Sequence, residues 1–257
     1  VLSVGITVQP GVEFTDMLVP FDMMAFEQFV VSPAPLTEPI APEGSIAMQQ
    51  TDASITLSGK NALVDKDFSI VLDKTAGTVT SWKLGDIEFV DRGPLANLFR
   101  APVDNDRPFR DSWRGSGLNR LETKVDGVDV SKLDDGAVVI KFNTTDASDR
   151  ASFKVEYCYT VFPNGWLVLD TTILPVKSPG VLPRVGVQLM MPESLDSVMW
   201  YGRGPWENYP DRKSGAGIGA WRKDVGMMVE QYVRPQEMGA RCDVRWLNVM
   251  KKTDEQI

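Results

Sequence analysis

Hydrophobic and polar residues alternate along much of the chain, with the period of two that is typical of half-buried β-strands. Residues 2–8 and 23–31 are two such runs near the N-terminus. The clearest run lies further on, where one face of a long predicted strand carries Phe153, Val155, Tyr157, Tyr159 and Val161. Shorter runs at 68–72, 79–84, 87–90, 138–142, 181–191 and 197–201 predict further strands.

Turn signals separate these runs. Asn164-Gly165 matches a two-residue hairpin turn in which both positions favour positive φ, and it leads into a strand over 166–174. Only residues 107–122 indicate a helix, and their glycines keep it short. Regularly spaced strands without alternating helices predict an all-β sandwich.

A proline-rich stretch divides the chain. The segment SPAPLTEPIAPEGS has prolines at positions 33, 35, 39 and 42, which is typical of a semi-rigid linker. Two or three strands do not form a stable sandwich by themselves, so residues 1–31 are predicted to be the last strands of a domain that starts earlier. The predicted organisation is 1–31, a linker over 32–50 and a main domain over 51–257.

Composition excludes several classes of protein. The 257 residues are 43% hydrophobic and 24% charged, which is typical of a globular chain, and no apolar run approaches the roughly 20 residues that span a bilayer. A net charge of −8 argues against nucleic acid as a partner. The chain has no histidine, which excludes Ser-His-Asp and Cys-His nucleophile systems and HExxH zinc sites. Cys158 and Cys242 leave the redox state open, and the cellular compartment is not assigned.

The first candidate stretch is NLFRAPVDND, residues 97–106. Asp104, Asn105 and Asp106 offer hard oxygen ligands of the kind that calcium prefers, although the spacing is not that of an EF-hand loop. In the alternative interpretation these side chains satisfy backbone donors of a turn. Both interpretations stay open at this point.

The second candidate stretch, residues 200–221, places aromatic rings beside carboxylates and amides. Carbohydrate sites use this combination, because sugar CH groups stack on rings while polar side chains bind hydroxyls. In the structural alternative, Arg203 and Arg212 pair with Glu207 and Asp211 in a rigid loop. The candidate substrate-binding residues here are Trp206, Glu207, Asn208, Tyr209, Asp211 and Arg212.

The third candidate stretch, residues 232–248, adds Gln236, Glu237 and Arg241 to the substrate-binding candidates. A carboxylate flanked by arginines usually has a depressed pKa, which suits binding or structure better than proton donation. Glycosidase chemistry needs one carboxyl with a raised pKa and one ionised carboxylate at a defined separation. No catalytic residue is therefore assigned in this chain.

In this order, the three stretches resemble the C-terminal part of the large β-galactosidases of glycoside hydrolase family 2. WYGRGPWENYPDR resembles the family signature G-x-GP-x-ENYPDR, with Gly202, Gly204, Pro205, Glu207, Asn208, Tyr209, Pro210, Asp211 and Arg212 in register. The later stretch resembles Y-x-x-P-x-E-x-G-x-R at Tyr232, Pro235, Glu237, Gly239 and Arg241. More weakly, residues 23–31 resemble the last strand of the immunoglobulin-like domain that precedes this region. The likeness covers nearly the whole chain.

The resemblance implies a large twisted antiparallel β-sandwich, a supersandwich similar to galactose mutarotases, preceded by the last strands of an Ig-like sandwich. In this family the catalytic glutamates lie on an upstream (β/α)₈ barrel, and Mg²⁺ and a monovalent cation bind outside this region, so no cofactor is expected here. The family's domain also continues past a segment like 243–248. We therefore expect a C-terminally incomplete domain whose open edges or bare apolar faces favour self-association into a homo-oligomer.

The implied function is that of a non-catalytic portion of a retaining β-galactosidase, inactive alone, with a scaffold or carbohydrate-binding role. Its implied partners are the upstream barrel and, through the parent enzyme, terminal β-galactosides; the aglycone preference stays open. One alternative is a stand-alone carbohydrate-binding module with Trp206 and Tyr209 as an exposed stacking platform. Another is a mutarotase-like epimerase, which the absence of histidine disfavours because such enzymes use histidine for acid–base work.

Overall fold

The computed structural model describes residues 2–7, 23–29 and 44–251. These residues form antiparallel sheets with little helix, so the predicted all-β fold is confirmed. The chain divides into two compact units. Unit 1 consists of Val1–Pro39, Asp196–Gln231 and Met238–Ile257, and unit 2 consists of Ile40–Leu195 and Tyr232–Glu237. The predicted division at residues 31 and 50 stays a prediction, and residues 30–43 of the proline-rich stretch lie outside the described residues.

The first sheet of unit 2 has five strands in the order β3-β4-β5-β6-β7. They are β3 (Ala47–Gln50), β4 (Ser54–Asn61), β5 (Lys66–Asp73), β6 (Thr78–Leu84) and β7 (Ile87–Glu88). On β5, Phe68, Ile70 and Leu72 are buried and their neighbours are not, so the alternation in sequence matches the two faces of the strand. Strand β3 starts within the range that the sequence assigns to the linker.

The second sheet of unit 2 has four strands in the order β12-β11-β10-β9. They are β9 (Glu122–Lys132), β10 (Val138–Ala147), β11 (Ser152–Val161) and β12 (Leu167–Lys177). The predicted apolar face of β11, from Phe153 to Val161, is buried throughout. All pairings in this sheet are antiparallel.

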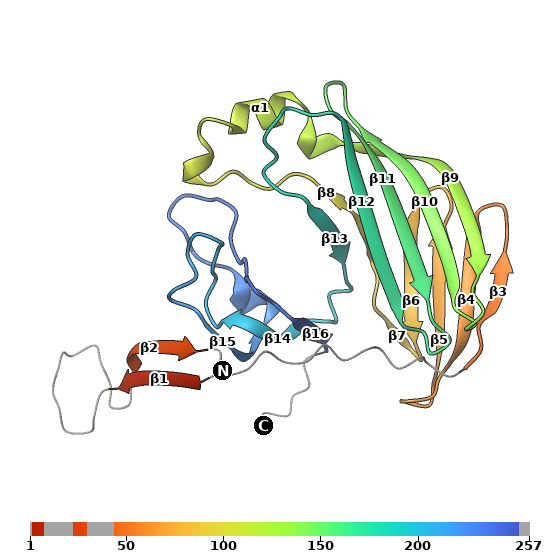
Figure 1. Cartoon of the computed structure of the whole chain (residues 1–257), viewed down its shortest axis with the longest axis horizontal. Helices are drawn as coiled ribbons and strands as arrows, with labels where there is room; N and C mark the ends of the chain where they lie inside the picture. Colours follow the sequence, from red (N-terminus) through yellow and green to blue (C-terminus); the bar gives the residue numbers. More distant parts are fainter. Residues whose placement is uncertain (1, 8–22, 30–43, 252–257) are drawn as a thin grey trace. The chain divides into compact units, whose positions relative to one another are not determined.

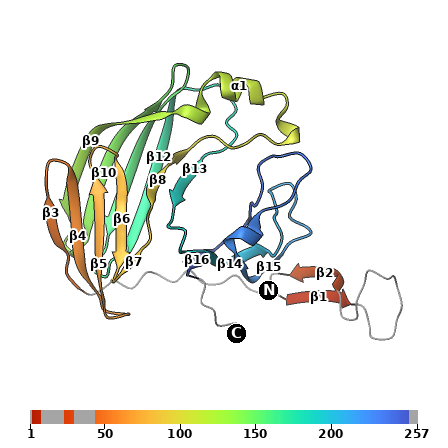
Figure 2. The ribbon, with the colours of Figure 1, turned by 180° about the vertical axis from the view of Figure 1, so that it is seen from behind.

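The two sheets pack face to face in unit 2, as the ribbon shows from both sides (Figures 1 and 2), and one hydrophobic core contains residues from both. Each large apolar side chain that is fully buried there contributes about 1.5–3 kcal/mol. Two core tyrosines keep their hydroxyls hydrogen-bonded: Tyr159 lies 3.2 Å from the Thr78 hydroxyl, and Tyr157 accepts the Ala96 N–H at 2.7 Å. Burial raises the pKa of Tyr159 to about 12. The sandwich core is therefore apolar, and the hydroxyl groups of its two tyrosines have hydrogen-bond partners.

A small sheet and short helices complete unit 2. Strands β8 (Arg92–Asn97) and β13 (Gly186–Met190) pair with each other, and α1 (Arg110–Gly115) and a 3₁₀ turn at Leu118–Arg120 follow β8. Trp113 of α1 is buried and donates its indole N–H to the Val181 carbonyl at 2.8 Å. The short helix predicted within 107–122 is confirmed. Within the described residues, no helix has the length and apolar character needed to cross a membrane.

The hairpin between β11 and β12 differs from its prediction. Gly165 has a φ of 80°, but Asn164 is not among the residues with positive φ. The Gly165 N–H instead donates to the Phe162 carbonyl at 2.8 Å, which makes a four-residue turn with Pro163 at its second position. Proline sets φ near −65° and favours a type I turn there, followed by a glycine in the left-handed region. The prediction of positive φ at both positions was wrong because it ignored the proline.

Unit 1 contains two small antiparallel sheets. β1 (Leu2–Thr7) pairs with β2 (Met23–Phe29), and the second sheet has the order β15-β14-β16, formed by β14 (Ser197–Gly204), β15 (Gly217–Asp224) and β16 (Trp246–Met250). The Gln28 side chain joins the two sheets, because it donates to the Ile218 carbonyl at 3.0 Å and accepts the Ile218 N–H at 2.5 Å. The predicted strands near the N-terminus are therefore present.

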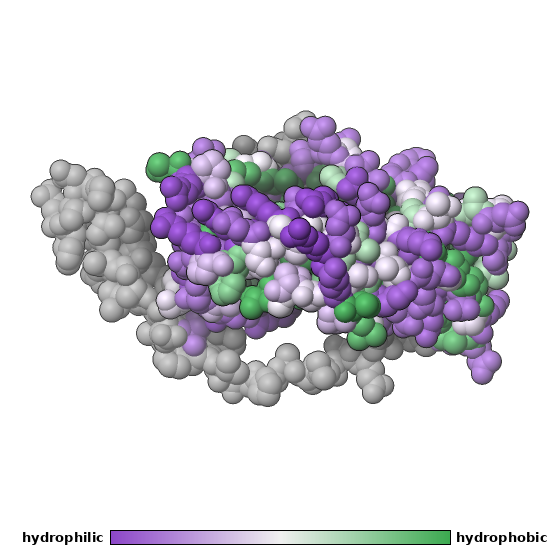
Figure 3. Space-filling view, turned by 90° about the horizontal axis from the view of Figure 1, so that it is seen from above, coloured by the Kyte–Doolittle hydropathy of each residue, from purple (hydrophilic) through white to green (hydrophobic). Residues whose placement is uncertain are grey.

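The face drawn in the space-filling view is mostly hydrophilic, with hydrophobic side chains in small separate patches (Figure 3). This distribution agrees with the 24% of charged residues in the sequence.

Candidate functional site

The stretch 97–106 in unit 2 is held by a buried ion pair. Arg100 donates from Nη1 to Oδ2 of Asp106 at 2.5 Å and from Nη2 to Oδ1 at 3.1 Å. Asp106 also accepts the Val103 N–H at 2.7 Å. Burial by itself would raise the pKa of Asp106, but these bonds and the charge of Arg100 together lower it. Asp106 therefore stays ionised and fixes the backbone of the stretch.

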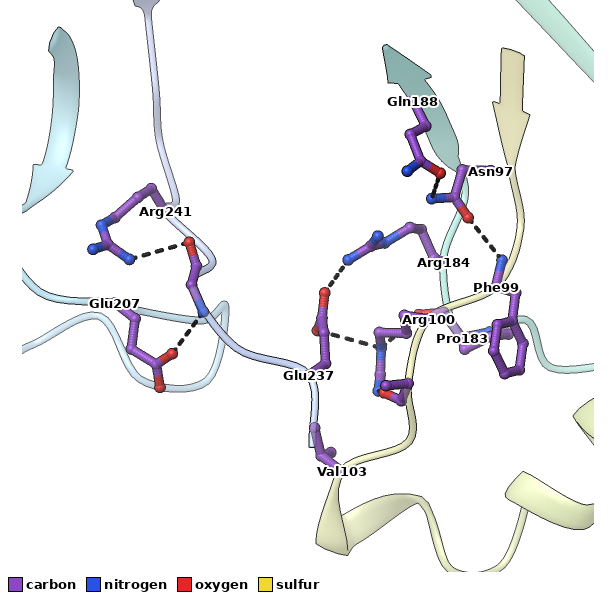
Figure 4. A network of polar contacts seen from close by, with 12 residues as sticks. Asn97, Phe99, Arg100, Val103, Pro183, Arg184, Gln188, Glu207, Glu237 and Arg241 are labelled. Carbon is purple, nitrogen blue, oxygen red and sulfur yellow. Dashed lines mark hydrogen bonds and ion pairs between the residues drawn. The ribbon is translucent and has the colours of Figure 1, made fainter. Parts of the chain in front are cut away.

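Glu237 extends this ion pair into a network within unit 2 (Figure 4). Its carboxylate pairs with Arg184 and lies 4.0 Å from Nε of Arg100. Nε of Arg100 also donates to the Pro183 carbonyl at 3.1 Å, and its guanidinium lies 5.7 Å from the centre of the Trp113 ring. We call Arg100, Asp106, Arg184 and Glu237 the Arg100 cluster.

The carboxylates that suggested a cation site have arginine partners. Asp104 accepts from Nη1 of Arg234 at 3.1 Å at the surface, and Asp106 belongs to the Arg100 cluster. Among the described residues, no group of three or more His, Cys, Asp and Glu side chains could hold a metal ion. Asp106 binds a backbone donor of the turn, as the second interpretation of this stretch expects.

In unit 1, Asn208 holds the chain on either side of residue 241. It is 1% exposed. Its Oδ1 accepts the Cys242 N–H at 2.7 Å, its Nδ2 donates to the Trp206 carbonyl at 3.0 Å, and its backbone N–H donates to the Ala240 carbonyl at 2.9 Å. The amide side chain therefore links two backbone segments, as a residue of a neighbouring strand would, and it uses both its N–H donor and its carbonyl acceptor to do so.

Glu207 holds the same segment through its carboxylate. Oε2 accepts the Gly239 N–H at 2.8 Å (Figure 4). Oε1 accepts from Arg212 at 2.6 Å. Arg203 and Arg212 were predicted to pair with Glu207 and Asp211, and the structure contains the Arg212–Glu207 pair. We call Glu207, Asn208, Arg212, Gly239 and Cys242 the Asn208 clamp.

Arg203 does not pair as predicted. Its Nε donates to Asp243 at 2.6 Å, and Lys213 donates to the other oxygen of Asp243 at 2.8 Å. These two cations hold the pKa of Asp243 at about 2. The prediction that Arg203 pairs with Glu207 or Asp211 was wrong, because a contact across 40 residues cannot be read from local spacing.

Arg241 lies against Trp200, with its guanidinium carbon 5.4 Å from the ring centre. Nη1 donates to the carbonyls of Gly239 and Ala240 at 3.1 Å each. Nε and Nη2 are buried and have no hydrogen-bond partner among the described residues. Burial lowers the pKa of Arg241. This arginine therefore stiffens its own loop and stacks on an indole.

The two rings of the predicted stacking platform differ in exposure. Trp206 is 63% exposed, and the Lys223 ammonium lies 4.6 Å from its ring centre. Tyr209 is half-buried, and the Arg212 guanidinium lies 5.7 Å from its ring centre. Trp206 is thus the ring that solvent can reach, and a cation already covers part of it.

The structure distributes the predicted site residues over both units. Unit 1 holds Trp206, Glu207, Asn208, Tyr209, Asp211, Arg212 and Arg241, and unit 2 holds Gln236 and Glu237. Of these, Asp211 is exposed at the surface. The sequence missed Arg184, Lys213 and Asp243, since a single arginine or lysine carries no signal of the distant carboxylate that it meets. Both clusters can bind and orient the backbone, with carboxylates that act as acceptors of arginine and amide N–H groups.

Fold and clusters together define the class, which is an antiparallel β-sandwich protein whose motif carboxylates hold the chain itself. Comparison with known proteins identifies the family. Residues 64–256 match the family described as Beta galactosidase small chain. The chain is 30% identical to a β-galactosidase of Priestia megaterium over 233 residues, which is 88% of this chain and 21% of that protein.

Two further relatives are similar in extent. A β-galactosidase of Psychromonas ingrahamii is 29% identical over 87% of this chain and 23% of its own length. A β-galactosidase of Halalkalibacterium halodurans is 30% identical over 88% of this chain and 22% of its own length. The chain belongs to the β-galactosidase small-chain family. It spans about a fifth of the length of these curated relatives.

Proposed function

We propose that this chain is a non-catalytic part of a retaining β-galactosidase of glycoside hydrolase family 2, which hydrolyses terminal β-galactosides. Support comes from the family match over residues 64–256 and from relatives that are β-galactosidases. In this proposal the chain is a scaffold that packs on a catalytic barrel and shapes the rim of the substrate pocket. The nucleophile and the acid/base carboxyl belong to that barrel, which the chain meets as a partner.

One observation carries the non-catalytic role. The motif carboxylates of Asp106, Glu207 and Glu237 each accept hydrogen bonds from arginine, and the first two, which are buried, also accept a backbone N–H. A retaining glycosidase needs a carboxyl that stays protonated at neutral pH, beside a second that attacks the sugar. Arginine partners occupy carboxylate oxygens that would attack the sugar. These carboxylates are therefore suited to holding the chain.

A chromogenic β-galactoside tests this role directly. We expect the pure 257-residue chain to release no leaving group above the buffer rate. As a control for contaminating enzyme, the Glu207→Gln and Glu237→Gln variants are purified and assayed in the same way. Turnover by the parent chain that either substitution abolishes would contradict the proposal.

The retaining mechanism is tested on the enzyme that contains the barrel. Because a covalent glycosyl-enzyme forms and is then hydrolysed on the same face, the first-formed product keeps the β configuration. Proton NMR of the anomeric signal during the first minutes of hydrolysis distinguishes the anomers. An α-galactose signal that precedes the β signal would contradict retention.

A second candidate function is favoured by the 63% exposure of Trp206. In that case the chain binds carbohydrate directly, with a sugar ring stacked on the indole in place of the Lys223 ammonium. Titration with galactose and lactose, followed by calorimetry, measures this. If the function is correct, Trp206→Ala abolishes binding, whereas the matched control Trp166→Ala, which removes a 47% exposed indole of unit 2, leaves it unchanged.

A further inference from the structure

The turn between β11 and β12 contains the one Asn-Gly pair of the sequence, Asn164-Gly165. Asparagine before glycine is prone to deamidation, because glycine has no side chain to hinder the approach of its backbone nitrogen. The Gly165 nitrogen attacks the side-chain carbonyl carbon of Asn164, and its proton leaves with the amide group as ammonia, which closes a succinimide ring. Water then opens the ring at either carbonyl and gives aspartate or isoaspartate.

In the folded chain both reacting groups are engaged in hydrogen bonds. The Gly165 N–H donates to the Phe162 carbonyl at 2.8 Å, and Oδ1 of Asn164 accepts the Trp166 N–H at 3.0 Å. Type I turns have a ψ of about 0° at their third residue, which is Asn164 here, whereas ring closure must rotate the peptide plane until the Gly165 nitrogen meets the side-chain carbon. These hydrogen bonds must therefore break before the attack.

The five-stranded sheet of unit 2 holds the turn from the other side. The Asn164 carbonyl accepts from Nδ2 of Asn61, at the end of β4, at 2.9 Å. Gly165 lies against Phe68 of β5, since a Cβ on this glycine would be 2.7 Å from the ring. Asn164 is 6% exposed, so the water that would open the ring has little access to it. The turn therefore opens only when contacts between the two sheets break.

The turn between β9 and β10 shows which product this geometry accepts. There the Gly136 N–H donates to the Leu133 carbonyl at 3.0 Å, and Gly136 has a φ of 85°, close to the 80° of Gly165. Oδ1 of Asp135 accepts the Ala137 N–H at 3.0 Å, as Asn164 does in its own turn. Aspartate therefore fits this turn, whereas isoaspartate adds a methylene to the backbone and cannot keep the same bonds.

We propose that Asn164 is a deamidation site that reacts only while the turn between β11 and β12 is open, so that the folded chain suppresses the reaction. This inference is independent of the proposed function. Because the reaction is irreversible, the converted fraction records how long this end of the sandwich has been open. Isoaspartate then prevents the turn from closing again, so a transient opening becomes permanent.

Peptide mapping of the 257-residue chain measures the conversion. After incubation at mildly alkaline pH, trypsin releases residues 155–177 as one peptide, and chromatography with mass spectrometry separates its asparagine, aspartate and isoaspartate forms. Conversion in concentrated urea should be about tenfold faster or more than in buffer, because opening of the turn limits the reaction in the folded chain. Equal rates in urea and buffer would overturn the protection, and a peptide that stays unconverted in urea would overturn the site.

The variant Asn61→Asp loosens the turn without altering the reacting atoms. It removes the Nδ2 donor to the Asn164 carbonyl and keeps an oxygen for the Leu63 N–H, which Oδ1 of Asn61 accepts at 3.0 Å. Conversion in buffer should be about three- to tenfold faster than in the parent, which corresponds to the loss of one hydrogen bond. Conversion in urea should equal that of the parent. An unchanged rate in buffer, or the same acceleration in urea, would contradict the requirement for opening.

Asn97→Asp is the matched control for this variant. Asn97 also lies in unit 2, and it makes the same two kinds of bond, because Nδ2 donates to Gln188 at 3.0 Å and Oδ1 accepts the Phe99 N–H at 3.1 Å. Its substitution changes the same chemical group away from the turn, so conversion of Asn164 should proceed at the parent rate. An acceleration equal to that of Asn61→Asp would contradict a role for the contacts of the turn.

Hydrogen exchange of the unmodified chain gives a measurement that needs no variant to fold. As urea is raised below the unfolding transition, exchange of the Gly165 amide and deamidation of Asn164 should accelerate in the same proportion. Both require the bond from Gly165 to the Phe162 carbonyl to break. Deamidation that stays constant while this amide exchanges faster would also overturn the proposal.

Discussion

Replacing Asn208 by alanine tests the interpretation that the ENYPDR motif holds the chain. The substitution leaves the Cys242 N–H and the Trp206 carbonyl without the partners that lie 2.7 and 3.0 Å away. Asn208 is 1% exposed, so water does not replace these bonds without a local rearrangement. A buried polar group left unpaired costs about 1–3 kcal/mol; at about 1–2 kcal/mol each, the lower part of that range, the two groups here cost about 2–4 kcal/mol.

Site-resolved hydrogen exchange measures this cost without requiring two-state unfolding. If the amide of Cys242 is released by 2–4 kcal/mol, its exchange should accelerate by roughly 30-fold to several hundred-fold. Asn105→Ala is the matched control, because Asn105 is exposed and its removal should leave the Cys242 amide unchanged. Equal exchange rates in the Asn208→Ala variant and the parent would refute the clamp.

Three further predictions concern stability. Gly93→Ala should abolish soluble folding, because a Cβ there would lie 1.9 Å from the Val79 carbonyl oxygen. The control Gly127→Ala adds a Cβ that meets nothing within 4 Å, so its soluble yield and urea midpoint should equal those of the parent. Equal soluble yields of the two variants would contradict this prediction. Asp243, whose pKa is about 2 through its lysine and arginine partners, should contribute stability above pH 3.8 that is lost as the pH falls toward 2. The urea midpoint of the Asp243→Asn variant should not show that loss at low pH. If the midpoints of the variant and the parent fall in parallel with pH, Asp243 is not the cause of the loss. For Asp146, burial raises the pKa above 3.8, so its ionisation should reduce stability as the pH rises through the raised pKa. The Asp146→Asn variant should not show that decline, and a decline of the same size would count against the assignment.

Alternation in the sequence predicted much of the sandwich. The period-two runs over 68–72 and 153–161 are buried on the face that they predicted, because a strand that covers a core must place every second side chain inward. The hairpin shows the limit of local signals. Asn164-Gly165 predicted the place of the turn but not its type, which Pro163 determines through its fixed φ.

The candidate site was harder to predict than the strands. The three motifs were found as stretches, and the expected pairing of Arg203 and Arg212 with Glu207 and Asp211 is present only for Arg212 and Glu207. The bond of Arg203 to Asp243 and the meeting of Arg184 with Glu237 join residues 40 and 53 positions apart. A one-dimensional pattern holds no signal for such contacts, because any carboxylate at the right place in space would satisfy the arginine.

The residue types alone therefore established the all-β class, the strand faces, the absence of histidine chemistry and the likeness to β-galactosidases. These are properties of composition and local periodicity, which do not depend on how distant segments meet. Only the tertiary structure decided that Glu207 and Asn208 hold residues 239–242, and that Glu237 belongs to a separate arginine network. Hydrogen bonds and ion pairs form between atoms that are close in space, and the packing of the sheets determines which atoms these are.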